Sequence, residues 1–414
     1  MPDFLTLNDL PLRGKTVLLR ADLNVPTKNG AVSDNARIER LLPTLRDLAK
    51  ENAKIVVLSH FGRPAPLAEG AAPDPKFSLR PAAAELERLW GQPVAFAEDC
   101  IGPKAEAAVK ALQPGHILVL ENTRFHGGEE KNDPAFAQAL AALGDLYVDD
   151  AFSCAHRAHA STEGVAHLLP SCAGRLMQAE LETLNLALGN PERPLGALVG
   201  GSKISTKLDL LNNLVAKVDI LVLGGAMANI FLAAKGVAIG KSMTEADMYD
   251  TARDIMKKAE ARGCYIVTPK DAVVASEVKE GIETQIVDIK NVPEGKMILD
   301  VGPETVKEIK ECFSLCKTVV WNGPLGVFEV RPFDKGTTEV AIFVADLTKR
   351  GKLMSVAGGG DTGSALTIAG VTYGMSYLST AGGAFLEWLE GKVLPGVAVL
   401  KLSLPTQKTA KVIM

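Results

Sequence analysis

The sequence predicts two doubly wound, Rossmann-like α/β domains with parallel sheets, joined by a helix, with an interdomain cleft. Three observations support this fold class. Strand-like and helix-like patterns alternate along the chain, which is typical of βαβ units in a parallel sheet. The 414 residues, 47% hydrophobic and 23% charged, can bury two cores and exceed the usual length of one compact domain. A long helix-like stretch at 175–194 separates two sets of these patterns.

The strand-like runs end differently in the two halves of the chain. Those of the first half run into Arg, His, Asp or Asn, and they are KTVLLRADLN (15–24), KIVVLSHFGR (54–63), HILVLENTR (116–124) and LYVDDAFSCAHR (146–157). Those of the second half run into glycines, and they are PLGALVGGSK (194–203), DILVLGGAM (219–227), TVVWNGPLG (318–326) and LMSVAGGGDT (353–362). Ligands of open parallel sheets bind outside the carboxyl ends of the strands. The endings therefore predict two different ligand sites, one rich in arginine and one rich in glycine.

Helix-like patterns follow most of these runs, at 35–52, 78–91, 133–144, 205–218 and 245–263. The stretch at 175–194 ends at Gly189 and meets two prolines, which indicates the end of a connecting helix. The predicted divisions are a first domain at 1–174, an interdomain helix at 175–189, a second domain at 190–393 and a C-terminal tail at 394–414 that packs back toward the first domain.

Charge and hydropathy exclude several classes of protein. The net charge of −4 argues against a general nucleic-acid binder, which would carry a basic domain or stripe. No apolar run reaches the roughly 18 residues of a membrane helix, and the first residues lack the basic-then-apolar order of a signal peptide. We expect a cytoplasmic protein with no membrane or nucleic-acid partner, and we also predict a monomer.

The six cysteines indicate neither a disulfide framework nor a metal centre. Cys312 and Cys316 are spaced by four residues without a second pair of ligands nearby. Cys154, His156 and His159 are three possible ligands without a fourth, which is a weak zinc signature.

Cations gather at the strand ends of the first half. Ten of the 16 arginines but only eight of the 29 lysines lie in the first 170 residues. The segments concerned are RADLN (20–24), Arg37, HFGR (60–63), NTR (122–124) and HR (156–157). Such groups repel one another unless an anion lies between them, and arginine's planar fork suits phosphate and carboxylate. With Asp22 and Asn24 as acceptors for hydroxyls, this set indicates a small phosphorylated acid as ligand.

The second half carries its cations in GGSKISTK (200–207). Lys203 and Lys207 fall on the first turn of the predicted helix, where cations oppose the macrodipole by roughly 0.3–1 kcal/mol each. A bound anion would reverse that effect, although two solvated lysines pointing away are the alternative. Asp361, beside three glycines, is a natural carboxylate for a Mg²⁺ ion that accompanies a polyphosphate, or else a cap for the next helix.

The segment GGGDTG (358–363) matches the G-x-G-x-x-G fingerprint of dinucleotide binding. The acidic residue expected about 20 positions further on is missing, because no Asp or Glu occurs from Thr362 through Leu386. The missing acidic residue lowers the support for NAD binding, and an NAD-dependent dehydrogenase is kept only as an alternative. A non-catalytic anion-binding module is a third hypothesis, but it would require lost site residues.

One series of segments spans nearly the whole chain: RADLNVP (20–26), SHFGRP (59–64), ENTRF (121–125), DAFSCAHRAHAS (150–161), GGSKISTKL (200–208), DVGPET (300–305), WNGPLGVFE (321–329), GGGDT (358–362) and STAGGAFLEWLEGKVLPGV (379–397). The series resembles the phosphoglycerate kinase family, in that family's order. The resemblance implies reversible phosphoryl transfer from 1,3-bisphosphoglycerate to ADP, giving ATP and 3-phosphoglycerate, with Mg²⁺ bound as MgADP or MgATP. Ala226 and Leu325 depart from residues frequent in the family, near the adenine pocket.

The resemblance also implies a site residue by residue. The acid substrate falls on the first domain, at Asp22, Asn24, Arg37, His60, Arg63, Arg124, His156 and Arg157. The nucleotide falls on the second domain, at Lys203, Lys207, Gly224, Asn322, Glu329, Gly359, Gly360, Asp361 and Thr362. Glu329 is the implied ribose contact and Asp361 the implied metal ligand. Because the acyl phosphate is already activated, no general base is required, and we assign Arg37 and Lys203 to the transferring phosphoryl oxygens.

Overall fold

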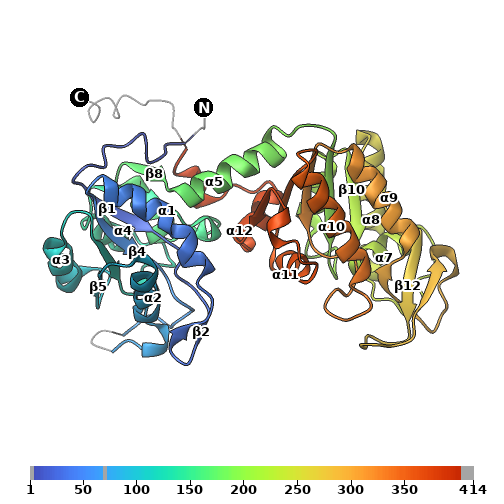
Figure 1. Ribbon diagram of the computed structural model, residues 1–414, viewed down its shortest axis with the longest axis horizontal. Coiled ribbons are helices and arrows are strands. Elements are labelled where there is room, and N and C mark those ends of the chain that lie inside the picture. Colours follow the sequence, from blue (N-terminus) through green and yellow to red (C-terminus); the bar gives the residue numbers. More distant parts are fainter. Residues whose placement is uncertain (1–3, 69–71, 402–414) are drawn as a thin grey trace. The chain divides into compact units, whose positions relative to one another are not determined.

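The computed structural model describes residues 4–68 and 72–401 and divides the chain into two compact units (Figure 1). The first unit comprises Met1–Glu182 and Val393–Met414, and the second comprises Thr183–Lys392. The sequence-based boundaries were 174, 189 and 393. Of the tail predicted at 394–414, residues 402–414 lie outside the described residues.

A six-stranded parallel sheet in the order β5-β6-β4-β1-β7-β8 forms the centre of the first unit. Its strands are β1 (Thr16–Arg20), β4 (Lys54–Leu58), β5 (Val94–Ala97), β6 (Ile117–Leu120), β7 (Leu146–Asp149) and β8 (Ser171–Ala173). Its helices are α1 (Ala36–Lys50), α2 (Arg80–Trp90), α3 (Gly102–Ala111), α4 (Pro134–Ala141) and α13 (Pro395–Ala398). A short hairpin of β2 (Thr27–Lys28) and β3 (Ala31–Val32) lies between β1 and α1.

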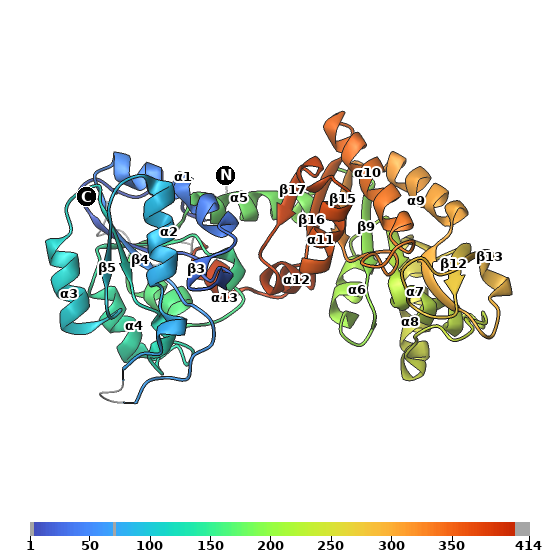
Figure 2. The ribbon, with the colours of Figure 1, turned by 60° about the horizontal axis from the view of Figure 1, so that its bottom comes forward.

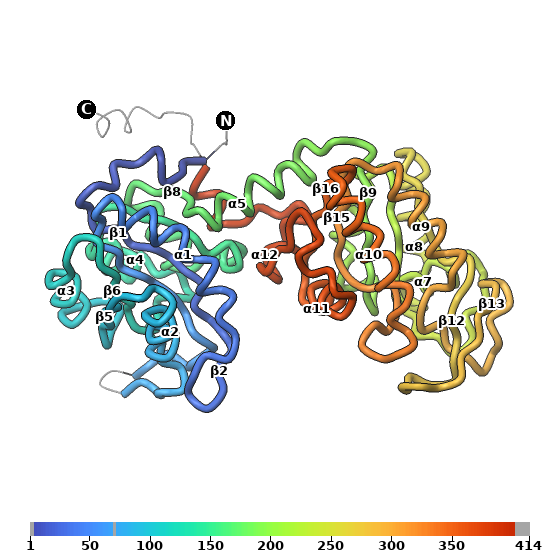
Figure 3. Tube along the Cα trace, viewed as in Figure 1, coloured from blue at the N-terminus to red at the C-terminus, as the bar shows by residue number. Residues whose placement is uncertain are grey.

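Apolar side chains cover both faces of this sheet, which explains why its strands are continuous hydrophobic runs. On β1, Val17 and Leu19 pack into one core with residues of α1 and α2, whereas Leu18 packs into a second core with residues of α3 and α4. The helices therefore cover opposite faces of the sheet. The chain returns to this unit from Val393 (Figure 3). Gly396 of α13 donates to the carbonyl of Ala155 at 2.9 Å.

The second unit contains a parallel sheet in the order β11-β10-β9-β15-β16-β17. Its strands are β9 (Leu195–Gly200), β10 (Ile220–Gly224), β11 (Tyr265–Val267), β15 (Thr318–Asn322), β16 (Met354–Gly358) and β17 (Tyr377–Ser379). Its helices are α6 (Leu208–Val215), α7 (Gly225–Ala234), α8 (Tyr249–Arg262), α9 (Pro303–Leu315), α10 (Lys335–Lys349), α11 (Gly360–Ile368) and α12 (Gly383–Leu389). Figure 2 shows α9 and α10 on one side of the sheet and α6, α7 and α8 on the other. The predicted doubly wound parallel sheets are thus confirmed in both units.

The order of the second sheet fixes where a ligand can bind. Taken in chain order its strands are arranged 3-2-1-4-5-6, the order of classic dinucleotide-binding sheets. After β9 the chain adds β10 and β11 on one side of β9, and it then adds β15 on the other side. The loops that follow β9 and β15 therefore run to opposite sides of the sheet, which makes this position a topological switch point. Ligands of open α/β sheets bind in the crevice at such points.

Two elements differ from the sequence-based expectation. The connecting helix α5 (Arg175–Leu184) ends earlier than predicted and continues as a π-turn at Asn185–Gly189. An antiparallel sheet of β12 (Asp271–Ala275), β13 (Gln285–Asp288) and β14 (Met297–Val301), which the sequence did not predict, completes the second unit.

Candidate active site

The carboxyl end of β1 holds an acidic side chain between two donors. Arg37, near the start of α1, donates from Nη1 to Asp22 Oδ2 at 2.6 Å and to the carbonyl of Asn24 at 3.1 Å. The same Asp22 oxygen accepts from Ser153 Oγ at 2.5 Å. The side-chain oxygen of Asn24 accepts from the amide of Gly62 at 2.9 Å, which ties this loop to the one after β4.

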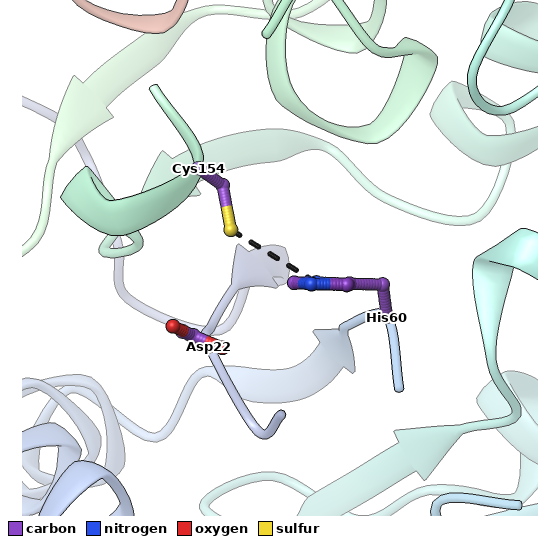
Figure 4. Close-up of side chains that lie close together, drawn as sticks. All are labelled: Asp22, His60 and Cys154. Carbon is purple, nitrogen blue, oxygen red and sulfur yellow. Dashed lines mark hydrogen bonds between the residues drawn. The ribbon is translucent and has the colours of Figure 1, made fainter. Parts of the chain in front are cut away.

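His60 is buried, and its ring lies near the side chains of Asp22 and Cys154 (Figure 4). Its Nδ1 lies 3.1 Å from Nη2 of the buried Arg20 and 3.9 Å from Cys154 Sγ. Burial, together with the charges of Arg20, Arg124 and Arg157, holds the pKa of His60 far below its usual range. The imidazole is therefore neutral, and its Nδ1 accepts a hydrogen bond from the guanidinium, which can only donate.

Two further arginines face the same region. Arg124 is 5% exposed and donates from Nη1 to the carbonyl of Gly62 at 2.7 Å, while its Nε lies 2.9 Å from Glu130 Oε1 without the alignment of a hydrogen bond. Burial, together with the charges of Arg124, Arg20, Arg157 and His156, lowers the pKa of His159 to about 4. The charges of Arg20, Arg124 and Arg157 thus act on both His60 and His159 and favour the neutral form of each ring.

We use the name basic cluster for Arg20, Arg37, His60, Arg124, Arg157 and His159. Of the predicted acid-site residues, the structure thus brings Asp22, Asn24, Arg37, His60, Arg124 and Arg157 together, with His156 acting on His159. Arg63 is exposed beside Gly62, and no described hydrogen bond fixes its side chain. Sequence reasoning counted Arg20 only among the cations at the strand ends, considered His159 only as a possible zinc ligand, and gave no role to Ser153. A charge at the end of the apolar run of β1 was the available signal for Arg20.

Asp22, His60 and Cys154 also place three possible metal ligands within 4.8 Å of one another (Figure 4). A metal cation there would be repelled by the guanidinium of Arg20. That guanidinium already donates to Nδ1 of His60, the ring nitrogen that a metal would need. Burial also raises the pKa of the Cys154 thiol, so that no thiolate is ready to bind a metal. This group fits an anion site and not a metal centre.

In the second unit a lysine connects two loops at the switch point. Lys207 Nζ donates to the carbonyl of Gly200 at 2.5 Å and to Asn322 Oδ1 at 2.7 Å. Asn322 Nδ2 in turn donates to the carbonyl of Gly358 at 2.8 Å. Burial lowers the pKa of Lys207 to about 8, although the charge of Asp361 acts in the opposite direction.

Glycines allow these loops to approach one another as backbone. A Cβ on Gly200 would lie 1.8 Å from the carbonyl oxygen of Pro324, and one on Gly323, whose φ is +100°, would lie 2.2 Å from the carbonyl oxygen of Gly200. The amide of Gly225 donates to the carbonyl of Leu325 at 2.8 Å. The loops after β9, β10, β15 and β16 thus form one surface, here called the glycine platform, made of Gly200–Gly201, Gly224–Gly225, Asn322–Leu325 and Gly358–Thr362.

Helix α11 begins within the glycine platform. Its N-cap Gly359 has a φ of +103°, and a Cβ there would lie 2.8 Å from Asn322 Nδ2. Thr362 Oγ1 accepts from the amide of Gly323 at 2.7 Å. The N-cap residue is Gly359, and Asp361 lies exposed in the first turn of the helix. The alternative in which Asp361 caps this helix is therefore wrong.

One detail of the predicted lysine pair is also wrong. Helix α6 begins at Leu208, so Lys203 lies in an exposed loop and Lys207 is the N-cap residue, not a member of the first turn. The amide of Lys207 donates to the carbonyl of Ile204 at 2.8 Å, which forms a turn before the helix. Lys203 is therefore held less firmly than Lys207.

A cavity of about 310 Å³ extends from the glycine platform into the second unit. Exposed Glu329 and Asp361 line it, as do Ala226 and Leu325. Asn229 also lines the cavity; it is 1% exposed, and its Oδ1 has no hydrogen-bond partner among the described residues. The lining is predominantly apolar and includes the carboxylates of Asp300, Glu329 and Asp361, a combination typical of small-molecule sites.

Comparison with known proteins identifies the family. The family model described as phosphoglycerate kinase matches residues 7–392. The chain belongs to the phosphoglycerate kinase family. A phosphoglycerate kinase of Rhodospirillum centenum is 61% identical over 397 residues, which cover 96% of this chain and 99% of the relative. A phosphoglycerate kinase of Cereibacter sphaeroides is 58% identical over 396 residues, or 95% and 98% of the two chains.

Solved phosphoglycerate kinase structures show the same fold. The one from Coxiella burnetii matches with a TM-score of 0.89 at 43% identity and covers 96% of this chain and 98% of its own. The one from Pyrococcus horikoshii matches with a TM-score of 0.78 at 32% identity, with the same coverage. The chain is therefore an enzyme, a transferase of glycolysis that moves a phosphoryl group between 1,3-bisphosphoglycerate and ADP.

This finding confirms the predicted activity, and it gives no support to the dehydrogenase or to the non-catalytic module. All six cysteines are free. Among the described residues, no helix has both the length and the apolar character needed to cross a membrane.

Proposed function

We propose that the basic cluster binds 3-phosphoglycerate or the acid part of 1,3-bisphosphoglycerate, and that the glycine platform with its cavity binds MgADP or MgATP. The supporting observation is that the chain has two groups of donors with different chemistry, the basic cluster in the first unit and the glycine platform with Lys207 in the second. Arginine forks and a neutral histidine suit a small acid with a phosphate and a carboxyl group. Backbone amides, a desolvated lysine and an apolar cavity suit a nucleoside diphosphate.

In the acid site, Arg63, Arg124 and Arg157 hold the phosphate that is not transferred. His60 is neutral, its Nδ1 accepts from Arg20, and its Nε2 donates to a substrate oxygen. His156 contributes to the electrostatic environment of the neighbouring His159. Asp22 and Asn24 accept from the hydroxyl group. Asp22 also keeps Arg37 extended toward the reacting group, because its carboxylate lies 2.6 Å from Arg37 Nη1.

In the nucleotide site, Lys207 lies against the phosphates together with the backbone at Gly224, Gly359 and Gly360. Asn322 and Thr362 keep the loops in register through their hydrogen bonds to Lys207 and Gly323. Glu329 accepts from the ribose hydroxyls at the cavity. Lys203, in its exposed loop, is free to follow the phosphoryl group that moves.

Asp361 fits a magnesium ion that accompanies the nucleotide. Its carboxylate is exposed and makes no hydrogen bond or ion pair with any other described residue, so both oxygens are available to a hard cation. The bound ion supplies positive charge beside the nucleotide phosphates. Of the other carboxylates that line the cavity, Glu329 is assigned to the ribose and Asp300 is buried, which leaves Asp361 as the proposed carboxylate ligand.

No residue needs to act as a general base, because the acyl phosphate is activated and the oxygen of ADP is already ionised. Catalysis then depends on position and on charge stabilisation. Arg37 and Lys203 stabilise the negative charge of the transferring phosphoryl oxygens, where preorganised donors are most effective.

The two substrates are proposed to bind to different units, yet the reacting atoms must come within about 3–3.5 Å of each other. The units therefore close around both substrates and exclude water, which would hydrolyse the acyl phosphate. Gly174 and Gly189 flank the connecting helix as candidate hinge positions. Small-angle scattering should show a smaller radius of gyration with both substrates than with either alone, and an equal radius in an active enzyme would contradict closure.

The direct test of the site assignment is calorimetry with single ligands. Arg124→Ala should weaken 3-phosphoglycerate binding and leave MgADP binding unchanged, whereas Lys207→Gln should do the reverse. The opposite pattern would exchange the two sites. We also propose a monomeric, cytoplasmic enzyme, and light scattering after gel filtration tests the monomer.

A further inference from the structure

A fully buried carboxylate lies behind the basic cluster without contacting any proposed substrate atom. Glu129 is 0% exposed. Its Oε2 accepts from the amide of Ser161 at 3.0 Å and its Oε1 accepts from the hydroxyl of Ser161 at 2.5 Å. Because the hydroxyl hydrogen of Ser161 points at Glu129, the lone pairs of its Oγ remain available to a donor.

That donor is the guanidinium of Arg20. Its Nε donates to Ser161 Oγ at 3.0 Å, its Nη1 donates to the carbonyl of Ala21, and its Nη2 donates to His60 Nδ1 at 3.1 Å. Burial by itself lowers the pKa of Arg20, but neighbouring acidic groups, Glu129 among them, raise it above its ordinary value. The arginine thus stays charged inside the protein and is directed at three acceptors.

The last contact decides the tautomer of His60. A guanidinium has no acceptor, so the Nδ1 that faces Arg20 must carry a lone pair, and a neutral ring then has its hydrogen on Nε2. Cys154 Sγ faces the same Nδ1 at 3.9 Å (Figure 4) and is likewise a donor, because burial raises the pKa of its thiol. The opposite tautomer would place an N–H against both groups.

The hydroxyl of Ser161 lies between the charges of Arg20 and Glu129, and it determines which nitrogens of Arg20 are used. A carboxylate bonded directly to Arg20 would occupy two of its nitrogens as a fork. Because Glu129 acts through Ser161, only Nε is used, and Nη2 remains free for His60. The charge of Glu129 still lies close enough to stabilise the buried guanidinium.

We propose that Glu129 and Ser161 are positioning residues of the acid site: through Arg20 they hold His60 as the Nε2–H tautomer, so that it is always a hydrogen-bond donor to the acid substrate. Neither residue touches the substrate. The inference rests on the proposed function for the part that concerns substrate, but its first step concerns the ligand-free protein alone.

The first measurement is the nitrogen NMR spectrum of the ¹⁵N-histidine-labelled, ligand-free full-length protein, with the His60 signals assigned by their loss in His60→Ala. Wild-type protein should show His60 as the Nε2–H tautomer at neutral pH. Glu129→Gln keeps the shape and removes the charge, and Ser161→Ala removes the intermediate hydroxyl. In both variants, the spectrum should show a population of His60 as the Nδ1–H tautomer or as the protonated ring.

Glu163→Gln is the matched control. Glu163 lies two residues after Ser161, but its carboxylate contacts Asn132 and His167 and not the chain that leads to His60. Its spectrum for His60 should equal that of the wild type. Thermal melting of all variants shows which remain folded, and if Glu129→Gln does not fold, Ser161→Ala decides.

The second measurement is the KM for each substrate. Glu129→Gln and Ser161→Ala should raise the KM for 3-phosphoglycerate by about tenfold, the effect of one lost hydrogen bond to a charged group, with the KM for ATP unchanged. An unchanged His60 tautomer in folded Glu129→Gln or Ser161→Ala overturns the inference, as does a lower melting temperature with wild-type KM values. If instead His60→Ala keeps the wild-type KM for 3-phosphoglycerate, the role of His60 in the proposed function fails.

Discussion

The ammonium of Lys207 lies 2.7 Å from the side-chain oxygen of Asn322, so one half-buried cation connects the loops after β9 and β15. Its three donor hydrogens find two described acceptors, Asn322 and the carbonyl of Gly200. Burial without a full counter-charge lowers the pKa of Lys207 to about 8. A bound phosphate would supply that counter-charge and restore the ordinary value.

Binding of MgADP should therefore take up a proton in mildly alkaline solution. The free protein loses the Lys207 proton as the pH rises through its lowered pKa of about 8, whereas in the nucleotide complex the pKa should return toward its ordinary value of 10.5. Affinity for MgADP should fall with rising pH in this window, by up to about tenfold per pH unit for one linked proton. Calorimetry in buffers of different ionisation enthalpy measures the uptake.

Lys207→Gln should abolish this proton uptake and weaken MgADP binding at pH 7. Lys217→Gln, which changes an exposed lysine just after α6, is the control and should behave as the wild type. Proton uptake that persists in Lys207→Gln would assign the titrating group elsewhere.

Arg37→Ala should lower turnover by about 10²–10³ and leave the fold intact, because a preorganised donor to a developing charge is lost. The side chain is 39% exposed and its pair with Asp22 adds little to stability. Coupled assays and thermal melting measure the two effects. Arg46→Ala, an exposed arginine on the same helix, is the control, and near-wild-type turnover in Arg37→Ala would remove it from the mechanism.

Asp361→Asn should weaken MgADP binding by about tenfold or more, since the amide keeps the shape and removes the charge that a hard cation prefers. Binding of 3-phosphoglycerate should not change. Asp346→Asn changes a half-buried residue of α10 that pairs with Arg350, and it is the control. Unchanged calorimetric affinity for MgADP in Asp361→Asn would show that the metal is held elsewhere.

Gly200→Ala should destabilise the second unit by about 1–3 kcal/mol, the cost of overpacking at a rigid contact. Its Cβ would meet the backbone oxygen of Pro324 at 1.8 Å, which cannot move aside as a side chain can. MgADP affinity should fall too. Gly295→Ala, where a Cβ meets nothing within 4 Å, should stay within about 0.5 kcal/mol of the wild type in denaturant unfolding, and equal loss at both positions would contradict the close-contact argument.

The alternation of strand and helix patterns was sufficient to predict both parallel sheets, because the buried strands are continuous apolar runs such as Leu195–Gly200. The strand-end residues then marked where polar groups gather. The sheet of β12, β13 and β14 was not predicted, since β13 is largely exposed and carries no periodic apolar signal. The start of α6 was misplaced by several residues for a similar reason: the turn before Leu208 depends on contacts of the glycine platform.

The role of Arg20 could not be predicted from its local sequence. Its partner Ser161 follows 141 residues later, and Ser161 reaches Glu129 across a further 32 residues. A hydrogen-bonded chain of this kind exists only after the fold brings β1 and the segments after β4, β6 and β7 together. A lone charge in an apolar strand shows that a partner must exist, but not which residue it is.

The glycine platform has a consequence for protein engineering. In the proposed nucleotide site, the platform would meet the phosphates with backbone and with Lys207. Every nucleoside diphosphate has these phosphates, so the base would be distinguished by side chains of the cavity such as Ala226, Asn229 and Leu325. In this proposal, one part of the pocket binds the phosphates and another part recognises the base. A redesign for another nucleobase can change the second part and leave the first untouched.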